Sequence, residues 1–192
     1  MNGYILAGGK SSRMGLDKGL LYFGQKQLVE YAIHSIQNHV DQLFIITKNK
    51  EYEKFGFTLI EDITPNLGPA GGIFTALNHS ETEKNLIIGC DMPFISDDLI
   101  QQLSAQKNVT SISIFKNNAF IEPLFGIYSK SIIPIWKDCL DQNILKLEAI
   151  LSKCPTNYIS FFPKTGMNPF ANINSKEDIE KYTIEIKKLS DD

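Results

Sequence analysis

The chain has 192 residues, of which 43% are hydrophobic and 21% are charged, and its formal net charge is −3. This length fits one ordinary domain with a real core, and the composition excludes a disordered or collagen-like chain. The weak negative charge argues against general nucleic-acid binding, and no apolar stretch approaches the roughly 18 residues of a membrane span.

Short apolar runs alternate with amphipathic stretches along the whole chain, which predicts strands that alternate with helices. The expected strands or extended pieces are 3–7, 20–26, 43–47, 58–62, 85–91, 110–115, 122–128 and 157–163. Helices are expected at 27–40, from about Ala70, and from Ser96 to about 105. One or two more are expected within 129–153, and a last one at 176–189 after Ser175. Residues 51–55 are expected to form a single helical turn. Such βαβ units predict one α/β domain over residues 1–192, with a mostly parallel sheet and helices on both faces.

The three cysteines, Cys90, Cys139 and Cys154, are far apart and are not in Cys-x-x-Cys spacing. This usage is typical of a reduced, cytoplasmic protein and argues against a disulfide scaffold or a zinc site. The first residues contain no basic lead followed by a long apolar segment, so we expect no secretory signal.

The segment AGGKSSRMGLDKG, residues 7–19, directly follows the first expected strand. Glycines at this place let the backbone approach a ligand and point N–H groups at it. Arg13 is the only arginine in the chain, and a lysine-rich, glycine-rich loop with one arginine suits a polyphosphate. Neither the P-loop spacing nor the dinucleotide fingerprint is present, and a flexible surface turn is the alternative interpretation.

Residues 6–21, LAGGKSSRMGLDKGLL, resemble the signature Leu-Ala-Gly-Gly-x-Ser-x-Arg-Met-Gly-x-Asp-Lys of nucleotidyltransferases with a Rossmann-like sheet. The Leu-Ala-Gly-Gly form is most similar to the molybdenum cofactor guanylyltransferases. The later segments LIEDI, GPAGGI, CDMPF, EPLFGIY and FANINSKEDIEKY resemble the same family in the same order. The resemblance therefore covers nearly the whole chain and implies a single three-layer nucleotidyltransferase domain.

The resemblance implies an enzyme that transfers GMP from GTP to the terminal phosphate of molybdenum-molybdopterin and releases pyrophosphate, with Mg²⁺ as its cofactor. The N-terminal half would bind the nucleotide and the C-terminal half the second substrate. Proteins that deliver the molybdenum cofactor would be transient partners, whereas nucleic acid and membranes would not. The alternatives are a cytidylyltransferase for the same pterin, a sugar-phosphate nucleotidyltransferase, and a nucleotide-binding partner protein without turnover.

The same resemblance assigns nucleotide contacts to the start of the chain. Leu6, Ala7 and Gly8 would present their backbone to the nucleotide. Arg13 and Lys18 would bind the triphosphate and offset charge as pyrophosphate leaves. The alternatives are a structural salt bridge for Arg13 and a solvated side chain for Lys18.

Two aspartates follow expected strands, where a side chain points into the ligand crevice of an α/β sheet. Asp91 precedes Met92-Pro93, and the resemblance implies that it is the magnesium ligand, since Mg²⁺ prefers oxygen. Asp62 would contact the ribose or the base. An N-cap or turn aspartate is the alternative for Asp91, and a plain turn aspartate is the alternative for Asp62. Gly68 to Gly72 would let the backbone approach the base, or only form a tight turn.

Several other polar residues are open to two interpretations. The family often has an asparagine where this chain has Thr47, with Asn49 two residues later, which puts guanine recognition through this position in doubt. Asn172 and Asn174 lie in a segment that the family associates with the second substrate, or they form a turn before the last helix. Glu122 would face the pterin or lie at a strand edge.

Overall fold

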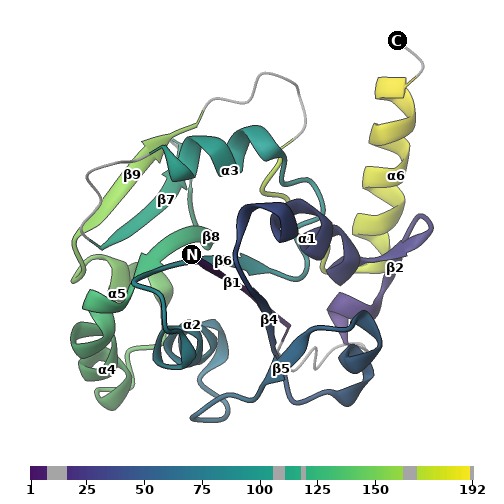
Figure 1. Cartoon of the computed structure of the whole chain (residues 1–192). Coiled ribbons are helices and arrows are strands. Elements are labelled where there is room, and N and C mark those ends of the chain that lie inside the picture. The colour runs from purple at the N-terminus through teal and green to yellow at the C-terminus, as the bar shows by residue number, and fades with distance from the viewer. Residues whose placement is uncertain (8–16, 106–110, 118–119, 162–167, 191–192) are drawn as a thin grey trace.

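The computed structural model describes residues 1–7, 17–105, 111–117, 120–161 and 168–190. Seven of the described strands form one sheet in the order β5-β4-β1-β6-β8-β7-β9 (Figure 1). These strands are β1 (Asn2–Leu6), β4 (Leu43–Ile46), β5 (Thr58–Ile60), β6 (Lys84–Gly89), β7 (Ile112–Lys116), β8 (Ile121–Ser129) and β9 (Thr156–Ser160). A second, two-stranded sheet pairs β2 (Tyr22–Phe23) with β3 (Lys26–Gln27).

Strands β5, β4, β1 and β6 are parallel, and β1 lies between two apolar neighbours, with Ile5 opposite both Ile45 and Ile88. Strand β8 is antiparallel to both β6 and β7, while β7 and β9 are parallel to each other. The sheet is therefore mostly parallel, as the sequence predicts, with one reversed strand in its second half.

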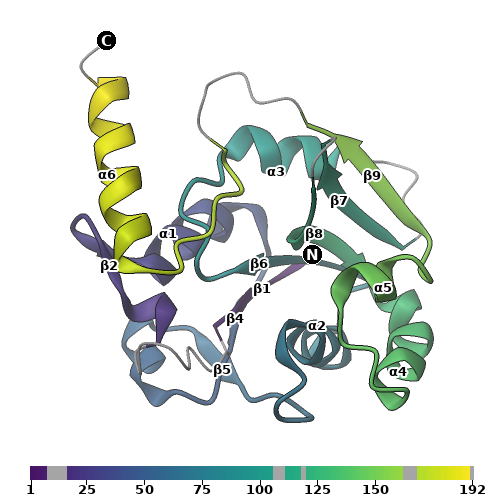
Figure 2. The ribbon, with the colours of Figure 1, turned by 180° about the vertical axis from the view of Figure 1, so that it is seen from behind.

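Helices cover both faces of this sheet, as Figures 1 and 2 show. The α-helices are α1 (Leu28–Ile36), α2 (Gly68–His79), α3 (Asp97–Ser104), α4 (Ile133–Asp141), α5 (Leu147–Leu151) and α6 (Lys176–Ser190). The 3₁₀ helices are η1 (Lys18–Leu20), η2 (Gln37–His39), η3 (Lys50–Phe55) and η4 (Lys130–Ile132). Apolar side chains of α1 and α3 join one core cluster, and those of α2, α4 and α5 join another.

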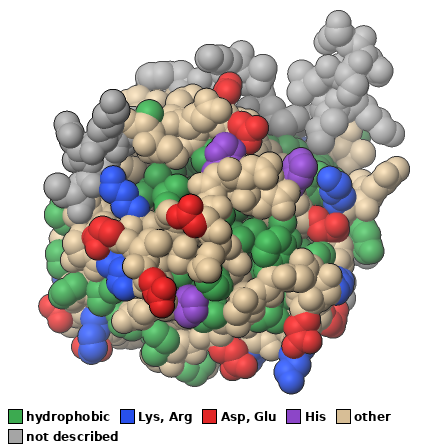
Figure 3. Space-filling view, viewed as in Figure 1, with side chains coloured by type: hydrophobic (Ala, Val, Ile, Leu, Met, Phe, Trp, Pro, Cys, Tyr) green, Lys and Arg blue, Asp and Glu red, His purple; other side chains and the backbone are tan. Residues whose placement is uncertain are grey.

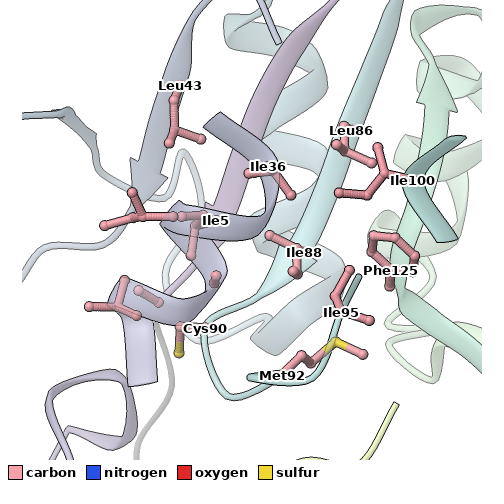
Figure 4. Close-up of a cluster of buried hydrophobic side chains, with 14 of the residues drawn as sticks. Ile5, Ile36, Leu43, Leu86, Ile88, Cys90, Met92, Ile95, Ile100 and Phe125 are labelled. Carbon is pink, nitrogen blue, oxygen red and sulfur yellow. The ribbon is translucent and has the colours of Figure 1, made fainter. Parts of the chain in front are cut away.

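The two clusters form because successive residues of a strand point to opposite faces of the sheet. Tyr4 belongs to the cluster beneath α2 and α4, whereas the next residue, Ile5, belongs to the cluster beneath α1. Ile87 and Ile88 of β6 divide in the same way. Figure 4 shows the cluster around Ile5, with side chains from β1, β6, α1 and α3 in contact. Burial on both faces explains why the strands are continuous apolar runs.

Helix α6 projects from the body of the molecule (Figures 1 and 2). A third apolar cluster, centred on Phe23, Leu28 and Ile173, joins the β2–β3 hairpin to the start of this helix, whose Ile179 and Tyr182 pack against it. Ser175 caps α6, because its Oγ accepts a hydrogen bond of 3.1 Å from the Asp178 N–H.

Most predicted elements are confirmed within a few residues. The helix expected at 27–40 ends earlier, at Ile36, and continues as the tighter η2. Ser96 occupies the N-cap position of α3, as expected, but its side chain makes no capping hydrogen bond there. The turn expected at Gly24 is present and uses a φ of 63°, which glycine adopts without strain.

The molecular surface carries charges of both signs, and Figure 3 shows lysines interspersed with acidic side chains on one face. None of the helices in the described ranges combines the length and the apolarity that a membrane crossing requires.

Candidate active site

The site lies at the edge of the sheet where the parallel strands end. Three backbone hydrogen bonds continue the pairing beyond the strands: Cys90 N–H to Leu6 (3.1 Å), Ala7 N–H to Ile46 (3.0 Å) and Thr47 N–H to Ile60 (2.9 Å). They hold the carboxyl ends of β6, β1, β4 and β5 level with one another. The residues that follow these strands are therefore brought to one edge, where open α/β sheets bind ligands.

A pocket of about 570 Å³ opens beside this edge. The described residues that line it are Ala7, Asp17, Thr47, Lys48, Asn49, Glu61, Asp62, Pro65, Asn66 and Gly68. This described part of the wall carries three carboxylates and one lysine, so it is rich in hydrogen-bond acceptors. Such a wall suits the N–H and O–H donors of a nucleoside better than a phosphate chain.

Lys18 lies close to the pocket, in the turn that follows Asp17. Its Nζ donates a hydrogen bond of 2.5 Å to Oδ1 of Asn174 and lies 3.9 Å from Oδ2 of Asp91. The Lys18 side chain is 35% exposed and that of Asp91 is 15% exposed. Three segments that are far apart in the sequence thus place an ammonium group between a carboxylate and an amide oxygen.

Asp91 follows the end of β6 and is tied to the C-terminal part of the chain. Its backbone oxygen accepts a hydrogen bond of 3.0 Å from the Ile173 N–H. Burial raises the pKa of the Asp91 carboxyl, while the charge of Lys18 and a backbone hydrogen bond act in the opposite direction. A largely buried carboxylate at the carboxyl end of a strand is the kind of hard oxygen ligand that Mg²⁺ prefers.

Asn172 and Asn174 differ in their surroundings. Asn174 accepts from Lys18 through its side chain, and its backbone N–H donates to Asp178 at 2.9 Å. The Oδ1 atom of Asn172 is buried and has no hydrogen-bond partner among the described residues. Of the two, Asn174 is the one that meets the Lys18–Asp91 pair.

Asp62 lies on the opposite side of the pocket, beyond β5. Its Oδ1 accepts a hydrogen bond of 3.3 Å from the Thr75 hydroxyl on α2. Burial raises the pKa of Asp62, and the Thr75 hydrogen bond lowers it in part. A Cβ on Gly72 would lie 3.2 Å from Cδ2 of Leu6 and 3.9 Å from Oδ1 of Asp62, so a glycine here keeps α2 close to both residues. Leu6 and Asp62 therefore lie on one side of the site.

Glu122 is a buried acid, only 7% exposed, and it lies nearer the site than a strand-edge interpretation predicts. Strand β8 runs antiparallel to β6, and Glu122 is close enough to Asp91 for the charge of that aspartate to act on it. Burial raises the pKa of Glu122 to about 7; the Leu124 N–H lowers it, and the charge of Asp91 raises it further. Its carboxylate accepts a hydrogen bond of 2.9 Å from that N–H.

Gly8 and Arg13 lie outside the described residues. The structure brings together Lys18, Asp91 and Asn174, and it places Ala7 and Asp62 on the wall of the adjoining pocket. The sequence interpretation missed the contacts of Asp17, which lines the pocket and also binds Tyr52 and Asn49.

Comparison with known proteins identifies the family of this chain. Residues 3–156 match the family model described as MobA-like NTP transferase domain. A probable molybdenum cofactor guanylyltransferase from Flavobacterium johnsoniae is 40% identical over 184 residues, which is 95% of this chain and 96% of the relative. A molybdenum cofactor guanylyltransferase from Vibrio parahaemolyticus is 32% identical and covers 93% of this chain and 92% of its own.

The fold is also that of solved structures. The molybdopterin-guanine dinucleotide biosynthesis protein A from Archaeoglobus fulgidus superposes with a TM-score of 0.81 at 23% identity, over 98% of this chain and 100% of that protein. A 4-diphosphocytidyl-2C-methyl-D-erythritol synthase from Anaerococcus prevotii superposes with a TM-score of 0.69 at 14% identity, over 97% of each chain. The sequence matches, rather than the fold alone, place this chain in the MobA-like NTP transferase family.

Proposed function

We propose that this protein transfers the GMP part of GTP to the terminal phosphate of molybdenum-molybdopterin and releases pyrophosphate. The names of the relatives that match along nearly the whole chain support this activity. The observation that carries it is the meeting of Lys18, Asp91 and Asn174 beside an acceptor-rich pocket. A nucleotidyltransferase needs such a pair of neighbouring subsites, one for the nucleoside and one for the phosphates.

In this proposal the pocket binds the nucleoside, and the phosphates extend toward Lys18. The carboxylates of Asp17, Glu61 and Asp62 would repel a triphosphate, whereas Lys18 would attract it. Guanine and ribose offer N–H and O–H groups to acceptors in the pocket. Arg13, which the family signature places near the phosphates, would add a second cation with a geometry suited to two phosphate oxygens.

The donor set fits a magnesium ion that is bound mainly through substrate. Asp91 would supply a carboxylate to the ion, while the amide oxygen of Asn174 stays with the Lys18 ammonium. Among the described residues, no group of three or more His, Cys, Asp and Glu side chains could hold a metal by itself. Mg²⁺ commonly uses one or two protein oxygens together with phosphates, and it would neutralise charge on the triphosphate.

The reaction needs no nucleophile from the protein. An oxygen of the pterin phosphate attacks the α-phosphorus of GTP, and the bond from that phosphorus to the bridging oxygen breaks. Pyrophosphate leaves with the electron pair, so negative charge grows on it. Lys18 and Arg13 would donate hydrogen bonds to this charge, which is the stabilisation that such transfers need most.

Base recognition would use Thr47 rather than Asn49. The Asn49 amide already makes two hydrogen bonds that fix its orientation: its Nδ2 donates to Asp17 at 3.1 Å, and its Oδ1 accepts from the Glu51 N–H at 3.0 Å. The Thr47 Oγ1 accepts from the Asn49 N–H at 3.1 Å, which leaves its hydroxyl hydrogen to donate to a base oxygen. We therefore assign base recognition to Thr47, which stands at the position where the family often has asparagine.

The test measures pyrophosphate release with each of the four nucleoside triphosphates in the presence of molybdopterin and Mg²⁺. Of the four nucleotides, only GTP should support turnover when molybdopterin and Mg²⁺ are both present. Leaving out the pterin or Mg²⁺ should abolish turnover with GTP. Equal turnover with CTP would replace the guanylyl assignment by a cytidylyl one. Nucleotide binding without any pyrophosphate release would favour a binding protein over an enzyme.

A further inference from the structure

The carboxylate of Asp17 is held by three donors at the boundary between the pocket and Lys18. Its Oδ1 accepts hydrogen bonds from the Tyr52 hydroxyl at 2.5 Å and from the Gly19 N–H at 3.2 Å. Its Oδ2 accepts one from Nδ2 of Asn49 at 3.1 Å. The two oxygens are therefore satisfied by neutral groups of the protein, which suits a structural support better than a metal ligand.

The two side-chain donors are themselves fixed in place. Tyr52 is 0% exposed and packs in the core cluster beneath α1, and burial above all raises its pKa, so the hydroxyl stays protonated and remains a donor. Asn49 caps η3 through Oδ1, and its carbonyl accepts from the Tyr52 N–H at 3.3 Å. Because η3 follows β4, the donors are anchored to the central sheet.

The same contacts fix the backbone around Lys18. Asp17 is the N-cap of η1, and Lys18 is the first residue of that turn. The next residue, Gly19, is buried so closely against Tyr52 that an added Cβ would overlap the Tyr52 hydroxyl oxygen and lie 3.1 Å from Sγ of Cys90. The lysine therefore starts from a backbone that is held on both sides, and its ammonium reaches Asn174 and Asp91 from there.

We propose that Tyr52 and Asn49 are positioning residues for Lys18: through Asp17 they hold the turn from which the lysine reaches Asn174 and Asp91. The inference rests on the proposed function for the catalytic role of Lys18. Its structural part, that the two donors set the position of the lysine, is independent of the substrates. A long flexible side chain reaches one geometry reproducibly only if its own backbone is fixed.

The first experiment measures the position of Lys18 without any substrate. The full chain is acetylated briefly with sulfo-N-hydroxysuccinimide acetate, and the rate at each lysine is measured by mass spectrometry. Tyr52→Phe should raise the rate at Lys18 by roughly two- to tenfold, the equivalent of one lost hydrogen bond. Lys137, which pairs with Asp141 on the exposed side of α4, is the internal reference.

Two further variants separate positioning from general destabilisation. Tyr4→Phe is the matched control. Tyr4 is also 0% exposed and its hydroxyl is also hydrogen-bonded, to Nδ1 of His79, but it belongs to the other core cluster. It should leave the Lys18 rate unchanged. Asn49→Ser keeps an oxygen to cap η3 but removes the amide donor to Asp17, so it should raise the rate as Tyr52→Phe does.

The second experiment measures turnover with GTP, Mg²⁺ and molybdopterin. Tyr52→Phe should lower kcat roughly tenfold or more and change KM for GTP less, since a misplaced catalytic group affects the reaction more than binding. A wild-type chain that releases no pyrophosphate contradicts the proposed function and leaves the labelling result standing. If Lys18 is acetylated at the wild-type rate in folded Tyr52→Phe and Asn49→Ser chains, the positioning role is overturned, whatever the activity of these variants.

Discussion

The Nζ atom of Lys18 lies 2.5 Å from Oδ1 of Asn174, although 156 positions separate the two residues in the chain. This contact joins the turn after the first loop to the segment that precedes the last helix. It gives the asparagine a role in orienting the lysine, which a turn before a helix would not require.

Replacing Asn174 by alanine should therefore reduce turnover. We expect kcat to fall roughly ten- to hundredfold, because a catalytic group displaced by about 1 Å loses that much. Asn174→Asp keeps an oxygen acceptor for Lys18 and should retain more activity than the alanine variant. Asn78→Ala, at an exposed position of α2, is the control. Equal activity of Asn174→Ala and the wild type would exclude the role.

Replacing Asp91 by asparagine should abolish turnover and leave the fold intact. The variant removes the carboxylate that we assign to the metal. We expect kcat to fall at least a hundredfold, which is on the order of the loss when one contact to the transition state is removed. The melting temperature should not fall, because burial raises the pKa of this carboxyl and the neutral amide avoids that cost. Asp98→Asn, in the exposed first turn of α3, is the matched control. Full activity of Asp91→Asn at limiting Mg²⁺ would contradict the assignment.

Replacing Thr47 by valine should weaken GTP binding while keeping the shape of the pocket wall. The two side chains have nearly the same shape, so the variant mainly removes the hydroxyl. We expect KM for GTP to rise roughly two- to tenfold, the value of one hydrogen bond, with a smaller effect on kcat. Isothermal titration with GTP checks the change, and Thr58→Val at an exposed position of β5 is the control. Unchanged affinity would mean that the base is recognised elsewhere.

Glu122 should make the stability of the protein depend on pH. Burial raises its pKa from 4.5 to about 7, so the folded state binds this proton more tightly than the unfolded chain does. The stabilisation is complete below about pH 4.5 and is lost as the pH rises toward 7. A pKa difference of this size corresponds to about 3 kcal/mol.

Urea denaturation at pH 5 and pH 8 tests this expectation. The wild type should lose more free energy of unfolding between the two pH values than Glu122→Gln, which cannot ionise at this position. Parallel losses in the two proteins would show that Glu122 does not carry the effect.

The sequence predicted the alternation of strands and helices because burial on two faces leaves a direct trace in the apolar runs. The direction of β8 left no such trace: a strand has the same pattern whichever way it runs, and direction depends on the path of the connections. The early end of α1 at Ile36 was equally hidden, since the apolar period continues to Val40 while the backbone tightens.

The candidate site was predictable where a residue type follows a strand, as with Asp62 and Asp91. It was not predictable where contacts join distant segments. Nothing in the local pattern of Asn174 indicates Lys18, and nothing near Glu122 indicates that the charge of Asp91 acts on it. Two of the three donors to Asp17, Asn49 and Tyr52, belong to η3 and its cap and lie 32 and 35 positions away in the chain, so only folding brings them to the carboxylate.

The hydrogen bond from the Ile173 N–H to the Asp91 carbonyl has a consequence for biosynthesis. Strands β1, β4, β5 and β6 leave the ribosome early and can pair with one another while later residues are still being added. Asn174 and its anchor are translated long afterwards. The contact among Lys18, Asp91 and Asn174 would therefore be completed only near the end of synthesis.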